Sequence, residues 1–146
     1  MKKTKPAPTT TNVETQNDNC ILTGEAEKIN PHSTGLLHWE MTEYTDGERG
    51  LRITANDSGG LFSREWIALS AIKTVLKTHE TGDFTSTALR PLFASASRNN
   101  AGFLAAILRS ADICLTEEGA AGAFSHHCYP DWEKRLEKLL TLSPAA

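Results

Sequence analysis

The stretch from Phe84 to Ser110 carries three arginines and not one acidic residue. Its first part has an apolar side made of Leu89, Leu92 and Phe93, which predicts a short helix ending near residue 96. A polar break over residues 97–100 follows, and apolar residues then recur at helical spacing as far as Ser110. This order restricts the segment to two helices joined by a polar turn.

Alternating segments on either side predict two β-hairpins. The first covers residues 37–55 around an Asp46-Gly47 turn, and the second covers residues 112–129 with its turn centred on Ala120-Ala121. An apolar stripe predicts a helix over residues 64–78 with Ser63 as its N-cap, and a last helix is expected after Asp131. The expected order is a strand pair, three helices, a strand pair and a helix.

Composition predicts one ordered domain preceded by a tail. Residues 1–30 are rich in Thr, Asn, Pro and Lys, and they have too few apolar side chains to offset the entropy of ordering. We therefore expect a mobile tail over 1–30 and a single α+β domain over 31–146. With 146 residues, 39% of them hydrophobic, the chain is long enough for a core of its own.

The pattern over residues 63–129 resembles the winged-helix family, in which three helices are followed by a β-hairpin wing. The resemblance implies an α+β fold: a winged-helix-like three-helix core with an N-terminal β-hairpin, a C-terminal β-hairpin wing and a final α-helix. It implies that residues 98–110 form a recognition helix and residues 117–123 the wing tip. The tip departs from a DNA-contacting wing, because Glu117 and Glu118 stand where basic residues are expected.

In helix-turn-helix docking, the start of the second helix meets the edges of the bases. Arginine can donate two parallel hydrogen bonds to guanine, asparagine can pair with adenine, and serine can contact phosphate. The candidate nucleic-acid contacts are Ser95, Ser97, Arg98, Asn99, Asn100 and Arg109. The alternative interpretation is a solvent-facing turn and helix cap.

These features predict a small DNA-binding regulatory protein of bacterial or mobile-element type, reading duplex DNA as a homodimer on symmetric half-sites. The formal net charge of −3 excludes a protein that coats nucleic acid non-specifically. The alternative is a protein-binding inhibitor, adaptor or accessory factor that uses the same scaffold without DNA contact. Its support is the net acidity and the acidic wing.

No enzyme signature, cofactor motif or metal site is expected. The nearest approach to a metal cluster is Cys114, placed opposite His127 by the expected hairpin, with His126 and Cys128. Neighbouring strand residues point to opposite faces, so this set offers at most two or three ligands on one side, whereas zinc takes about four. Three widely spaced cysteines, no apolar segment after the lysine-rich start and no membrane-length apolar run favour the cytoplasm and no membrane contact.

Overall fold

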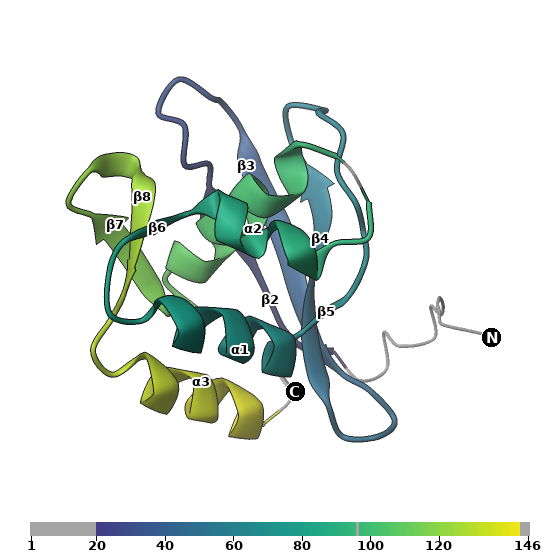
Figure 1. The fold of residues 1–146 in the computed structure, drawn as a ribbon. Coiled ribbons are helices and arrows are strands. Elements are labelled where there is room, and N and C mark those ends of the chain that lie inside the picture. The colour runs from purple at the N-terminus through teal and green to yellow at the C-terminus, as the bar shows by residue number, and fades with distance from the viewer. Residues whose placement is uncertain (1–19, 96, 144–146) are drawn as a thin grey trace.

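The computed structural model describes residues 20–95 and 97–143, which form two antiparallel sheets and four helical segments (Figure 1). The larger sheet has the order β2 (Cys20–Glu27), β3 (Leu36–Glu43), β4 (Arg49–Asn56) and β5 (Ile67–Ala68). The smaller sheet has the order β6 (Phe84–Thr85), β8 (Gly122–Cys128) and β7 (Thr116–Gly119). The α+β class expected from the sequence is confirmed.

The helical segments are α1 (Leu69–His79), the 3₁₀ helix η2 (Ser86–Leu92), α2 (Asn99–Arg109) and α3 (Trp132–Thr141). Helix α2 agrees with the predicted range 98–110 to within one residue at each end, and α3 begins directly after Asp131 as expected. Pro91 lies near the end of η2. The segment is a tight 3₁₀ helix that stops one residue later, so the missing Pro91 N–H interrupts little.

The first hairpin is confirmed as β3 and β4. Leu37, Trp39 and Met41 are buried on one face of β3, as the alternation requires, and Leu51 and Ile53 continue that face on β4. Together they form the inner surface of the larger sheet. Figure 1 shows the helices gathered on this side of the sheet.

The expected tail boundary at residue 30 is wrong for residues 20–27. They form strand β2, an eight-residue edge strand that pairs with β3 along its length. Its Gly and Glu residues are poor strand formers alone, but pairing with a buried neighbour overrides that preference. Gly24 is required there, because it lies opposite Trp39 and a Cβ would come within 2.7 Å of Trp39 Cε2. Residues 1–19 of the expected tail lie outside the described residues.

The helix expected over residues 64–78 begins five residues later than predicted. Ile67 and Ala68 join the larger sheet opposite Leu51 and Gly50, and Ala68 is the N-cap of α1. Ser63 caps a local turn instead, where its Oγ accepts the N–H of Glu65 at 3.1 Å. Sheet pairing therefore overrides the capping signal.

The second hairpin has the expected turn but a different register. Gly119 pairs with Gly122 across Ala120-Ala121, but the next pair is Glu118 with His126, so residues 123–125 of β8 bulge away from β7. His127 consequently lies opposite Glu117, and the predicted Cys114–His127 pairing is wrong. Cys114 precedes the strand, in a left-handed backbone conformation with φ of 51°.

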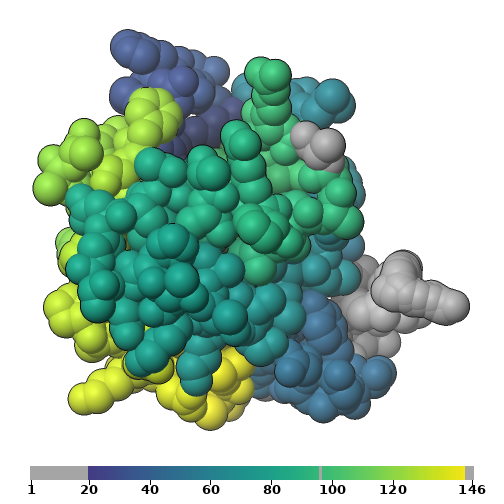
Figure 2. Space-filling model, viewed as in Figure 1, coloured from purple at the N-terminus to yellow at the C-terminus, as the bar shows by residue number. Residues whose placement is uncertain are grey.

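Helix α2 occupies the centre of the molecule. Seven of its eleven residues are buried, and it contacts η2 on one side and strands β2, β3 and β7 on others. Figure 2 shows the face opposite the larger sheet, where the teal segments of α1 and η2 cover the middle, and the hairpin of β7 and β8 (the predicted wing) and α3 lie along the margin. The domain is thus layered as sheet, α2, and a covering layer that contains η2.

Two glycines give opposite predictions for stability. Gly24→Ala would force a Cβ into the Trp39 ring, and such overpacking should lower the free energy of unfolding by about 1–3 kcal/mol.

Gly102 lies within α2, and a Cβ added there would have no atom within 4 Å, so close helix packing does not explain this glycine. Gly102→Ala should raise stability by about 0.5–1 kcal/mol, because alanine is the better helix former. Urea denaturation checks both, and equal effects would contradict this packing.

Candidate basic hollow at the start of helix α2

Four of the six residues predicted to contact nucleic acid line a surface hollow of about 440 Å³ in front of α2. Two arginines, two serines, an asparagine and two apolar residues line it: Arg90, Arg98, Ser95, Ser97, Asn100, Phe93 and Ala101. We call this feature the basic hollow. Four of the seven were predicted from the sequence, and the structure adds Arg90 from η2.

Arg90 and Arg98 give the basic hollow its charge. Both side chains are exposed, and neither has an ion pair or hydrogen-bonding partner among the described residues. Each guanidinium offers five N–H donors that no local acceptor occupies. No acidic residue lines the hollow, so its chemistry is that of an anion receptor.

The carboxylate of Glu65, which lies beside the segment leading into α2, is already engaged. It accepts the backbone N–H of Ala94 at 2.8 Å and that of Ser95 at 2.9 Å, and Ser63 Oγ donates to it at 2.8 Å. These hydrogen bonds fix the backbone of residues 94 and 95. This use leaves the two arginines without a local counter-ion.

Asn100 lines the basic hollow but belongs to the interior. It is 1% exposed, and its Oδ1 accepts the backbone N–H of Ser63 at 2.8 Å. Its Nδ2 is buried without a partner among the described residues. A buried amide left unpaired is rare in folded proteins, so this group requires an explanation.

The other polar residues around the start of α2 are bound locally. Asn99 Nδ2 donates to the carbonyl of Leu61 at 2.8 Å, and Ser97 Oγ donates to the same oxygen at 3.5 Å. Ser95 Oγ accepts the N–H of Ser97 at 3.3 Å. Of the six residues predicted from sequence, only Arg98 has a side chain free of such contacts in the described part of the chain.

Arg109 lies at the far end of α2 and away from the basic hollow. Its guanidinium donates to the carbonyls of Ala123 and Ser125 in the β8 bulge. It therefore ties the recognition-helix candidate to the wing. The structure does not bring Arg109 together with the other five predicted contacts.

The carboxylate of Asp83 holds the wing in place, and acidic residues lie at the edge of the wing. Asp83 accepts the N–H of Ala120 at 2.8 Å, the hydroxyl of Ser125 at 3.3 Å and contacts His127 Nδ1 at 3.1 Å. The Ala120 hydrogen bond, followed by those from His127 and Ser125, lowers the pKa of Asp83 below its ordinary value. Strand β7 also carries Glu117 and Glu118, which form no ion pair among the described residues, although the charge of Glu118 acts on Arg109.

His126 is the buried histidine of the wing. It is 1% exposed, its ring centroid lies 5.7 Å from that of Phe84, and its Nδ1 has no partner in the described residues. Burial, reinforced by the nearby charge of Arg109, lowers the pKa of His126 to about 4. The side chain is a neutral core residue, while neighbouring His127 points outward to Asp83.

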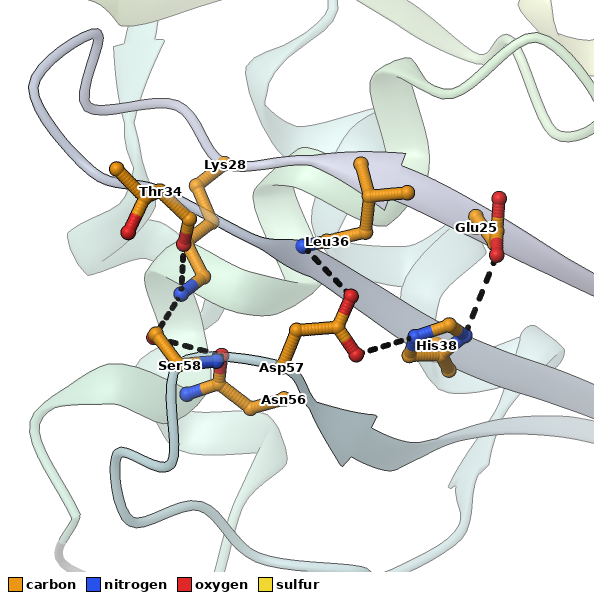
Figure 3. A network of polar contacts seen from close by, with 8 residues as sticks. All are labelled: Glu25, Lys28, Thr34, Leu36, His38, Asn56, Asp57 and Ser58. Carbon is orange, nitrogen blue, oxygen red and sulfur yellow. Dashed lines mark hydrogen bonds and ion pairs between the residues drawn. The ribbon is translucent and has the colours of Figure 1, made fainter.

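A second polar cluster, which the sequence did not suggest, lies where β2, β3 and β4 meet their loops (Figure 3). His38 contacts Asp57 at 2.8 Å through Nε2 and Glu25 at 3.6 Å through Nδ1. Asp57 also accepts the N–H of Leu36 at 3.2 Å, and Lys28 bridges Thr34 and Ser58. The hydrogen bond from His38, then that from Leu36, lowers the pKa of Asp57.

This cluster joins two loops and lacks the geometry of a nucleophile and base. Ser58 Oγ bonds to Lys28 and Asn56, not to His38. Both His38 nitrogens face carboxylates, so neither is left to take a proton from a hydroxyl. Pairing between β3 and β4 brings His38 near Asp57, a proximity that neither residue's local sequence signals.

The cysteines and histidines do not assemble a metal centre in the described residues: no three His, Cys, Asp or Glu side chains converge there. Burial raises the pKa of Cys128 to about 11, so its thiol stays protonated. Cys114 lies apart from it, against the Arg135 guanidinium at 3.1 Å. Across residues 20–95 and 97–143, no helix has the length and apolar character to cross a bilayer.

No family model, curated protein or solved structure matches this chain.

Substitutions at the start of α2 distinguish residues that stabilise the fold from residues whose side chains have no described partner. Asn100→Ala removes a buried acceptor and should lower the free energy of unfolding by about 1–3 kcal/mol. Arg98→Ala removes an exposed side chain with no described partner and should change it by less than about 0.5 kcal/mol. Chemical denaturation measures both values. Comparable losses would mean that Arg98 also belongs to the fold.

The buried His126 should make stability depend on pH. The unfolded chain binds a proton near pH 6.5, whereas the folded imidazole resists protonation down to about pH 4. Stability should therefore fall as pH drops through this window, by as much as about 3 kcal/mol. His126→Phe should flatten the profile between these values, while the exposed control His32→Gln should not. An unchanged slope in His126→Phe would contradict the assignment.

Proposed function

We propose that this protein is a protein-binding accessory factor, inhibitor or adaptor with a winged-helix-like core. The observation that carries the proposal is the burial of α2. A helix enters a DNA major groove only if one long face is free to meet the base edges. Here Leu104, Ile107 and Leu108 are each at most 2% exposed, and so is Ala106 on the side away from them.

Several elements cover α2 from different sides. Strands β2 and β3 contact the helix, and Lys28 just after β2 lies 5.8 Å over the ring of Phe103. Arg109 is bound to the wing. The larger sheet therefore occupies space that a recognition helix would need for DNA.

The surface charges also favour a protein partner over DNA. Two free arginines at one hollow neutralise few phosphates, and the acidic wing edge would repel a nearby backbone. Duplex DNA is retained as the second candidate because the basic hollow is an acid-free anion receptor. The winged-helix resemblance is compatible with either role, since one fold hosts many functions.

Binding to duplex DNA separates the two candidates. The purified chain is titrated with random-sequence duplex, followed by fluorescence anisotropy, from about 50 to about 200 mM salt. We expect no binding even at low salt, for wild type and for Arg90→Gln/Arg98→Gln alike. Binding that weakens steeply with salt and disappears in the double variant would refute the proposal.

A further inference from the structure

We infer that the basic hollow is the docking site for an acidic segment of a partner protein, with a carboxylate between Arg90 and Arg98 and an apolar side chain against Leu61. This inference rests on the proposed protein-binding function and names its contact surface and partner chemistry.

The positive charge of the hollow indicates that its ligand is an anion. Arg90 and Arg98 come from different elements, η2 and the turn before α2, and converge on one concave surface. Neither has a described counter-ion, and the nearby Glu65 is occupied by backbone N–H groups. Arginine pairs with carboxylates through two parallel hydrogen bonds, so two free guanidinium groups form a receptor for carboxylate oxygens.

Asn100 provides an independent sign of a missing acceptor. It is only 1% exposed beneath the same hollow, and Nδ2 has no hydrogen-bonding partner among the described residues. Its Oδ1 is fixed by Ser63 N–H at 2.8 Å, so the amide cannot turn to find a partner without losing that bond. Because Nδ2 is itself closed to solvent, a ligand oxygen becomes its acceptor when binding displaces the atoms that cover it.

The rim supplies the apolar part. Leu61 is 82% exposed, the most exposed large hydrophobic residue among those described. Its carbonyl is held by Asn99 at 2.8 Å, which anchors the backbone beside the hollow while the side chain stays outside. Phe93 lines the hollow itself and is half-buried. An exposed leucine whose carbonyl is bound by Ser97 of the hollow, together with two arginines in the hollow, complements a segment that combines acidic and apolar residues.

The test uses a synthetic Glu-Glu-Leu-Glu-Glu-Leu-Glu-Glu peptide and its glutamine counterpart, followed by ¹H–¹⁵N NMR of the full chain. We expect the acidic peptide to shift the Asn100 side-chain amide and the Arg90 and Arg98 Nε signals. Arg90→Gln/Arg98→Gln should weaken binding at least about tenfold, and Leu61→Ser should weaken it several-fold. The matched control Lys134→Gln/Lys138→Gln, on exposed α3 positions, should bind as wild type.

Several results would overturn the inference. These are no binding of the acidic peptide, equal binding of the glutamine peptide, equal loss in the α3 control, or inorganic phosphate alone reproducing the shifts at the same concentration. If the peptide fails and DNA also fails to bind, the hollow assignment is lost while the protein-binding role stands. If duplex DNA binds and displaces the peptide, the proposed function itself is lost.

Discussion

The contact between helix α2 and the larger sheet is the constraint on which the rest of the structure depends. The buried face of β3, led by Trp39, requires a neighbour without a side chain, and Gly24 of β2 provides it. This close approach completes the sheet that contacts α2, while η2 contacts the helix elsewhere. Both ends of α2 are then fixed, Asn100 by Ser63 and Arg109 by the β8 bulge.

The proposed function rests on the groups that this arrangement leaves at the surface. Polar side chains that would be free on an open helix are used to hold neighbouring segments, and only Arg90 and Arg98, among the described residues of the hollow, remain available. This surface is small, concave and positively charged. An exposed leucine lies beside it, and the acidic edge of the wing lies apart from it. Such a surface suits an acidic peptide segment better than the uniform charge of a duplex.

Sequence patterns predicted the elements whose signals are local. The alternation of residues 37–55, the polar break before α2 and the apolar spacing of α3 each appear in the structure near their expected positions. The errors arose from long-range pairing: β2 depends on β3, Ile67 joins β4, and a bulge anchored by Arg109 shifts the wing register. For the same reason the sequence located Arg98 but could not reveal that Asn100 is buried or that Arg90 lies beside it.

The burial of α2 at Ala106, on the side away from Leu104, can be measured directly from the accessibility of the Ala106 methyl group. Ala106 lies on the same face of the helix as Gly102 and Phe103, the side on which a recognition helix would meet DNA. Solvent paramagnetic relaxation enhancement with a neutral gadolinium chelate compares its methyl signal with those of buried Leu104 and exposed Leu61. We predict an enhancement as weak as that of Leu104. An enhancement approaching that of Leu61 would show a free helix face and contradict the burial of α2.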